Sequence, residues 1–330
     1  MKSKTLWILL FLVLLTWSCK KQDSGVIQQT FIGGNQGLSF KILEGAPPPV
    51  IQDEGSSPFS VSTTLSNVGE AEVGPDTENP FVLVRLLGIV PAQFGTKPEN
   101  LYQTLSHKLN GARRNFDGTI LPGEIEIATF EPLTFLGNVL ETNVITLRLD
   151  VCYDYTNYAT VKICLKDDII ENAQDSSLCN LRDLNLLVGN SAGPLHIVSA
   201  DQSPAGFDRI QVNLVVGHVG RGMNFRRGTE DPQKACDFSQ QNRDAFFATL
   251  NVKYEDPHFK LSCQGLTQQG PDGSTFGEIR LFDNAPTTVT CYLKRAEPIK
   301  NRVYQSIMNV KIKYRYGEFA EIPIAVQDVH

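Results

Sequence analysis

The sequence predicts an all-β protein that contains two tandem β-sandwiches, and three observations support this prediction. From about residue 28 onward, short apolar runs alternate with polar residues at the two-residue period of half-buried strands. The 18 prolines and 26 glycines supply turns of the kind that connect the strands of a sandwich. Several strand patterns also occur twice in the same order, which indicates a duplicated unit.

A turn-rich stretch divides the expected strands into two sets. The strands of the first set are residues 36–43, 59–69, 81–87, 123–127, 144–155 and 160–165. Residues 188–194 then combine glycine, asparagine, serine and proline between two apolar segments, as linkers between domains do. We therefore expect one sandwich over residues 29–190 and a second over residues 191–330, and we expect residues 195–330 to fold alone.

Three pairs of segments carry the internal repeat. They are residues 153–163 with 314–324, residues 59–69 with 209–220, and residues 123–127 with 277–281. Each segment of the first pair begins with Tyr-x-Tyr, and the two segments are 161 positions apart. These four tyrosines fall on the apolar phase of their strands, which predicts buried rings with a structural role rather than a binding platform.

The N-terminal residues have the pattern of an export signal. Lys2 and Lys4 precede an apolar run over residues 6–15, and Ser18 stands directly before Cys19. The pattern predicts a signal peptide over residues 1–18, because the apolar run is too short to span a bilayer. A cysteine after a small residue resembles the bacterial and archaeal lipoprotein motif. This resemblance implies lipidation of Cys19, a tether over residues 19–28 and a location on the outer side of the cell membrane.

Two features leave the lipoprotein interpretation open. Thr16 occupies the position at which the motif prefers leucine, and simple secretion with cleavage after Ser18 would produce the same pattern. Cleavage would also remove Lys2 and Lys4 and so lower the formal net charge of −6 by two.

The other six cysteines of the exported chain predict three disulfide bonds. They are Cys152, Cys164, Cys179, Cys236, Cys263 and Cys291. Strand phase places Cys152 and Cys164 on the solvent side of a hairpin with a loop after Tyr155, which predicts a cross-strand bond between them. Cys263 and Cys291 fall on inward phases and predict a second bond. Cys179 and Cys236 pair only by elimination, across the expected domain boundary.

The acidic composition and the missing motifs argue against several classes of function. A net charge of −6 is unfavourable for nucleic-acid binding, and the pairs Arg113–Arg114 and Arg226–Arg227 are interpreted as solvated loop charges. The five histidines form no catalytic or metal-binding motif, and Asp167–Asp168 and Glu230–Asp231 are interpreted as solvated turns rather than calcium ligands. We therefore expect no catalytic residue, no metal and no cofactor, and we predict that the protein is not an enzyme.

Two apolar connections have two possible interpretations. Their large apolar residues are Leu86, Ile89 and Phe94 in the first, and Phe130, Phe135 and Leu136 in the second. They contribute either to the core or to an exposed patch that binds another protein.

Several segments together resemble a known type of surface protein. They are Gly37-Leu-Ser-Phe, Ala46-Pro-Pro, Pro58-Phe-Ser-Val, Asn67-Val-Gly69, Val151-Cys-Tyr-Asp-Tyr, Val161-Lys-Ile-Cys164 and Cys179-Asn-Leu-Arg-Asp-Leu-Asn. The chain is similar to CARDB-type immunoglobulin-like domains and to tandem domains of predicted archaeal cell-surface proteins. The resemblance implies an immunoglobulin-like fold and a surface location, and it brings no known catalytic residue.

The expected function is therefore protein binding at the cell envelope, in adhesion or in the scaffolding of an envelope assembly. One alternative is a structural subunit that polymerises through its strand edges. Another is an accessory module of a surface enzyme.

Overall fold

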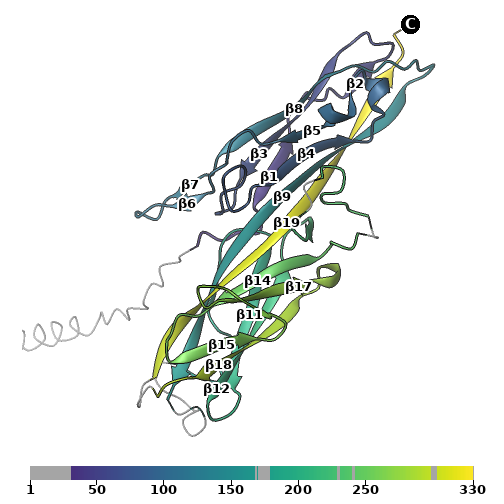
Figure 1. Ribbon diagram of the computed structural model, residues 1–330. Helices are drawn as coiled ribbons and strands as arrows, with labels where there is room; N and C mark the ends of the chain where they lie inside the picture. Colours follow the sequence, from purple (N-terminus) through teal and green to yellow (C-terminus); the bar gives the residue numbers. More distant parts are fainter. Residues whose placement is uncertain are drawn as a thin grey trace, which may run out of the picture. The chain divides into compact units, whose positions relative to one another are not determined.

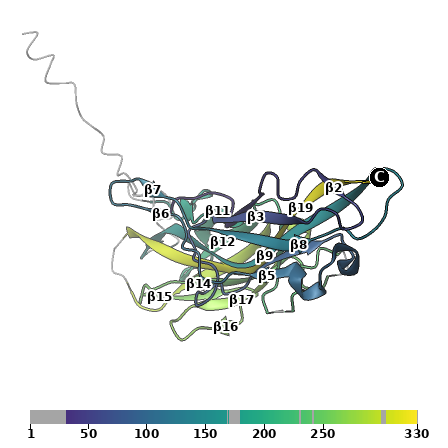
Figure 2. The same ribbon diagram turned by 90° about the horizontal axis from the view of Figure 1, so that it is seen from above.

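The fold is organised around two long neighbouring strands, β9 (Asn143–Lys166) and β19 (Val303–Gln327), which pair antiparallel along their length (Figures 1 and 2). The computed structural model describes residues 31–167, 169, 179–228, 231–239, 242–298 and 303–329. In these ranges the regular structure is β except for short 3-10 turns at Pro91–Phe94, Pro98–Leu101 and Phe282–Asn284. The predicted all-β sandwich class is confirmed.

The first sandwich places a three-stranded sheet against one part of a ten-stranded sheet. The small sheet has the order β1 (Leu38–Ile42), β3 (Phe59–Asn67) and β8 (Ile125–Leu133). Facing it are β5 (Tyr102–Thr104), β4 (Val82–Leu87), the first half of β9, the second half of β19 and β2 (Val50–Gln52). Alternating apolar residues of both sheets, among them Leu65, Phe130 and Leu149, are buried in a common core.

The second sandwich uses the other halves of the two long strands. Its four-stranded sheet has the order β11 (Leu195–Pro204), β12 (Arg209–His218), β18 (Thr287–Arg295) and β15 (Phe259–Cys263). Facing it are β10 (Val188–Asn190), the second half of β9, the first half of β19, β14 (Phe247–Lys253), β17 (Thr275–Arg280) and β16 (Gln268–Gln269). Leu214, Leu293 and Ile312 are buried in the same cluster as the first core.

The hairpin predicted after Tyr155 does not form, because β9 continues through it as one strand. Thr156 and Asn157, the polar residues that suggested a turn, are fully buried in the middle of β9. The hydroxyl of Thr156 donates to the side-chain oxygen of Asn79 at 2.7 Å, and the Asn157 amide donates to the Ser191 carbonyl at 3.0 Å. Partners remote in sequence satisfy these side chains, so the strand does not need to turn outward to reach water.

The strand order agrees with two of the three sequence repeats. β3 and β12 occupy matching places, because each lies between two neighbours of its small sheet, and β9 and β19 match as the long strands. The third match, residues 123–127 with 277–281, is wrong. Residues 125–127 belong to β8 of a small sheet, whereas residues 277–280 belong to β17 of the large sheet.

Strand pairing crosses the expected domain boundary at residue 190. β9 precedes this boundary and β19 follows it, yet each strand contributes one half to each sandwich. Residues 31–330 accordingly group into one compact unit. An exchange of strands between two copies of a unit is the arrangement of a domain swap, here within one chain.

The six cysteines form three disulfide bonds, and their pairing corrects the prediction. Cys263 and Cys291 are directly opposite each other in the β15–β18 ladder and are bonded, as predicted. The predicted bond between Cys152 and Cys164 is wrong. Cys152 is bonded to Cys236 and Cys164 to Cys179, so the pairing of Cys179 with Cys236 by elimination is also wrong. The reason is the continuous β9, which carries Cys152 and Cys164 into different sandwiches.

Candidate functional site

The middle of the β9–β19 pair carries four tyrosines on one face. Tyr153, Tyr155, Tyr314 and Tyr316 are fully buried, which confirms the predicted burial of the Tyr-x-Tyr elements. Tyr153 packs edge-on against Tyr316 with ring centroids 5.8 Å apart, and Tyr155 lies 6.3 Å from Tyr314. The rings therefore join the two sandwich cores and are not available as a binding platform.

Two glycine loops close over the hydroxyl groups of these tyrosines. A Cβ atom at Gly69 would lie 1.8 Å from the Tyr155 hydroxyl oxygen, and one at Gly220 would lie 2.2 Å from that of Tyr316. Only glycine permits such a close approach of the backbone. The loops after β3 and β12 are thus equivalent, which explains why both strands end on a pattern with glycine two residues later.

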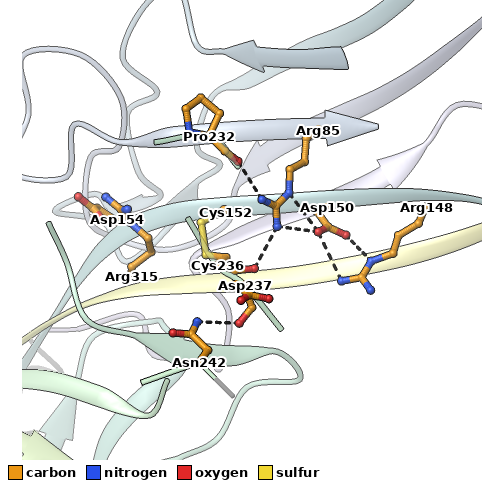
Figure 3. The surroundings of a disulfide bond; sticks show 10 residues. All are labelled: Arg85, Arg148, Asp150, Cys152, Asp154, Pro232, Cys236, Asp237, Asn242 and Arg315. Carbon is orange, nitrogen blue, oxygen red and sulfur yellow. Dashed lines mark hydrogen bonds and ion pairs between the residues drawn. A yellow bond between two sulfur atoms is a disulfide. The ribbon is translucent and has the colours of Figure 1, made fainter. Parts of the chain in front are cut away.

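The opposite face of the same strands carries buried ion pairs (Figure 3). Arg315 and Asp154 are 2.8 Å apart across the ladder. Asp150 accepts from Arg85 at 2.9 Å and from Arg148 at 2.6 Å. Because Asp150 and Asp154 are almost completely buried, each carboxylate needs its cationic partner to offset the loss of hydration.

A loop between β13 (Met223–Phe225) and β14 covers these ion pairs. Cys236 of this loop is bonded to Cys152, and Arg85 donates to the carbonyl oxygens of Pro232 at 2.9 Å and Cys236 at 3.0 Å (Figure 3). The face of β9 that strand phase assigned to solvent is therefore covered. Alternation identifies the two faces of a strand, but it does not show that a loop from 80 or more residues away will cover one of them.

The pair Arg226–Arg227 differs from its interpretation as solvated charge. The Arg227 guanidinium donates to the Tyr314 carbonyl at 3.0 Å and to the Thr156 hydroxyl at 3.0 Å, and burial lowers its pKa. Arg226 forms ion pairs with Asp244 at 2.8 Å and Glu278 at 2.7 Å. The hydrogen bonds of Arg227 thus connect the covering loop to the centre of β9 and β19.

A groove of about 640 Å³ lies beside this loop, along β1 and the second half of β19. Its lining consists of Gln36, Ser39, Phe40, Lys41, Ile42, Arg221, Gly222, Met223, Phe238, Glu318, Phe319 and Ala320. The lining of the groove therefore combines apolar rings with charged groups of both signs. Nothing in the sequence analysis pointed to the groove, because its residues come from four separate segments.

Two rings of the groove, Phe238 and Phe319, are held in defined positions by contacts with each other and with Arg148, which is not part of the lining. The Arg148 guanidinium lies over the Phe319 ring at 3.9 Å from its centroid, and Phe319 packs edge-on against Phe238 at 5.2 Å. Burial raises the pKa of Glu318, and the nearby charge of Arg221 partly opposes this shift. Because the Glu318 carboxylate is poorly hydrated, a cationic group placed next to it would form a favourable ion pair with it.

The outer edge of β19 is open next to the groove. β13 pairs with β19 as far as Gly317, and β2 pairs from Ala325 onward. Between these positions, no strand within the described part of the chain pairs with that edge. The amide of Ala325 donates to the Pro49 carbonyl at 3.0 Å, so the amides of Phe319 and Glu321 also point outward by alternation.

The predicted partner-binding residues lie mostly in the first core. Leu86, Phe94 and Phe130 are buried, and Ile89 and Phe135 are half-buried. Of the six, Leu136 alone is exposed, at 54%. The burial of these side chains supports the core interpretation.

Cys19, Asp168 and Glu230 lie outside the described ranges. Within those ranges, no group of three or more His, Cys, Asp or Glu residues is arranged to hold a metal ion. A second depression, of about 940 Å³, lies around Asp256 and Tyr304.

No protein-family model and no curated protein matches the chain. Among solved structures, the chain is similar to the Fcho1 Mu homology domain of Danio rerio with bound Eps15 peptide. The TM-score is 0.22 and the identity 8%, over 58% of this chain and 90% of that one. A likeness of this size carries no argument about function. No helix among the described residues is long and apolar enough to cross a membrane.

Proposed function

We propose that the protein is a non-catalytic lipoprotein of the cell envelope that binds another protein through the groove beside β19. In this proposal an extended segment of the partner adds to the open edge of β19 as an extra strand. The observation that carries it is the unpaired edge between Gly317 and Ala325, with a groove of mixed polarity alongside. Strand addition is a common way to bind a peptide, since the backbone provides affinity and neighbouring pockets provide specificity.

The groove has the chemistry to select a partner segment. Successive side chains of an added strand would point alternately to the two faces of β19. Those on one face would contact the rings of Phe238 and Phe319, and those on the other would meet the charges of Arg221 and Glu318. A segment that alternates apolar or basic residues with others would match this lining.

The open edge limits the length of an added strand. Pro323 lacks an amide hydrogen, so only Phe319 and Glu321 offer outward donors between the two paired ends. Proline at an edge is also a common protection against unlimited strand association. We therefore favour a short partner segment over polymerisation of the chain through this edge.

The envelope location rests on the sequence. Export is supported by the signal pattern of residues 1–18, and anchoring by the place of Cys19 directly after it. Three disulfide bonds among the described residues agree with an oxidising compartment outside the cytoplasm.

A site-specific photo-crosslinker at Phe319 tests the binding proposal in intact envelopes. We expect a covalent adduct with a different protein, and we expect Glu321→Pro to abolish it because this substitution removes an outward amide. The same crosslinker at Ile307, an exposed position on β19 far from the groove, serves as the control. An adduct with a second copy of the chain would favour the structural subunit instead. No adduct, or equal adducts at both positions, would contradict the proposal.

A further inference from the structure

A small hairpin carries exposed apolar side chains on its second strand and at its tip. β6 (Arg113–Arg114) and β7 (Ile120–Leu121) pair with each other as a separate two-stranded sheet and project from the remaining strands (Figures 1 and 2). The Phe116 side chain at the tip is fully exposed, and Ile120 and Leu121 are 52% and 43% exposed. Apolar side chains of a strand are usually covered by another part of the protein, and those of this hairpin are not. An isolated two-stranded hairpin is also only marginally stable in water.

The tip is a well-formed turn that holds Phe116 outward. The Asn115 amide donates to the Thr119 carbonyl at 2.8 Å, and the Gly118 amide donates to the Asn115 carbonyl at 3.0 Å. Asp117 accepts from the amide and the hydroxyl of Thr119 at 2.9 and 2.7 Å. These bonds satisfy the polar groups of the turn, so the exposure of the ring belongs to a defined conformation.

Neither face of the hairpin is specialised for contact with a flat surface. Arg113 is opposite Leu121 and Arg114 is opposite Ile120, so each face carries one cation and one aliphatic side chain. All four side chains are exposed. Each cation therefore lies level with an aliphatic side chain, and Phe116 lies beyond both pairs at the tip.

The base of the hairpin adjoins the point where the chain enters the fold. The Glu70 carboxylate accepts from the amides of Ile32 and Gly33, the latter at 3.0 Å. Gly69, which precedes Glu70 in the loop after β3, contacts the hairpin, because its carbonyl accepts from the Ala112 amide at 2.7 Å. Residues 32 and 33 and the base of the hairpin therefore contact the same loop.

We propose that residues 113–121 insert tip first into the interface of a membrane that contains anionic lipids. Phe116, Ile120 and Leu121 would enter the boundary between headgroups and acyl chains, and Arg113 and Arg114 would bind lipid phosphates. Tip-first insertion buries apolar groups on both faces at once, which a protein groove would do only if it enclosed the hairpin. Two cations against the single Asp117 carboxylate leave the hairpin positive although the whole chain is negative.

The membrane in question is the one to which Cys19 is anchored, and this part of the inference rests on the proposed function. The twelve steps from Cys19 to Phe31 span at most roughly 40 Å when fully extended. The anchor would thus keep the base of the hairpin near the bilayer, and insertion would add a second attachment that orients the sandwiches.

Tryptophan fluorescence provides a direct test. The chain has two tryptophans, Trp7 and Trp17, and both belong to the predicted signal peptide. The mature chain with Cys19→Ser and Phe116→Trp would therefore contain a single reporter and no lipid. We expect its emission to shift to shorter wavelength with vesicles of phosphatidylcholine and phosphatidylglycerol in equal parts. The shift should weaken with added salt and with Arg113→Gln plus Arg114→Gln.

A matched variant and a second vesicle type decide the result. Phe207→Trp replaces a residue that is 73% exposed in the β11–β12 loop, and it should show no shift. Vesicles of phosphatidylcholine alone should give a smaller shift for Phe116→Trp. No shift, equal shifts at both positions, or a shift only with envelope proteins would overturn the proposal. Because the tested chain lacks the lipid, this result is independent of whether Cys19 is modified.

Discussion

Asp154 and Arg315 are equivalent positions of the internal repeat and are also direct partners in the β9–β19 ladder. They are 161 positions apart, as are the two Tyr-x-Tyr elements, and their side chains form a buried ion pair at 2.8 Å. The twofold relation that exchanges the repeats therefore passes through this pair. In two identical repeats one residue would face its own copy, so a charged residue here would face a like charge. Opposite charges at this position stabilise the single-chain arrangement.

Removal of one partner of this pair should be costly. We expect Asp154→Ala to lower the free energy of unfolding by roughly 3–5 kcal/mol, because it removes the carboxylate that pairs with the buried Arg315 guanidinium. Urea unfolding measures the change. Glu72→Ala, which removes an exposed ion pair with Lys108, should cost less than about 1 kcal/mol. Equal losses in the two variants would contradict the role assigned to the buried pair.

The exchange of long strands predicts how a fragment behaves. Residues 195–330 contain β19 but lack β9, so one edge of β19 would lose its partner from Val303 to Val326. In contrast to the expectation from the sequence repeat, we now expect this fragment to associate or to lack a cooperative thermal transition. Calorimetry and sedimentation of the fragment measure both properties. Cooperative melting of a monomeric fragment would show that the exchanged pairing is dispensable.

The disulfide bonds should contribute unequally to stability. The Cys152–Cys236 bond closes a sequence separation of 84 residues, whereas the Cys164–Cys179 bond closes 15. The loss of loop entropy in the unfolded chain predicts stabilisation of about 4.5 kcal/mol for the first and about 3 kcal/mol for the second. Denaturant unfolding of the two double-serine variants tests this order. The reverse order would mean that local packing outweighs loop entropy at these bonds.

Glu78 should make the stability depend on pH in the acid range. Its carboxylate accepts from Lys313 at 2.7 Å, from Tyr158 at 2.7 Å and from Lys311 at 3.0 Å. Burial alone would raise its pKa, but these donors outweigh burial and lower the pKa from 4.5 to about 2. A lowered pKa in the folded state stabilises the fold above pH 4.5, and this contribution is lost as the pH falls toward 2.

Substitution of this carboxylate should reduce the dependence. We expect Glu78→Gln to be less stable than the parent at pH 6 and to lose less stability between pH 4.5 and pH 2. Urea unfolding across this range measures the slope. Glu72→Gln, which removes a negative charge from an exposed pair, should leave the slope close to that of the parent. An unchanged slope in Glu78→Gln would show that other carboxylates cause the acid sensitivity.

Local patterns of the sequence determined the fold class and several buried positions. Period-two alternation identifies strands and their apolar faces because each residue of a strand points to the side opposite its neighbour. This is why the burial of the four tyrosines and the pairing of Cys263 with Cys291, which lie on adjacent strands of one sheet, could be predicted. A constant repeat spacing likewise identified β9 and β19 as equivalent strands.

Only the tertiary structure decided where the strands continue and what covers them. Thr156 and Asn157 have the composition of a turn, yet partners at Asn79 and Ser191 keep them inside one long strand. That continuation sends Cys152 and Cys164 to different sandwiches and leaves the edge of β19 open between β13 and β2. A polar residue needs a hydrogen-bond partner in either setting, and the sequence alone does not show whether water or a distant segment supplies it.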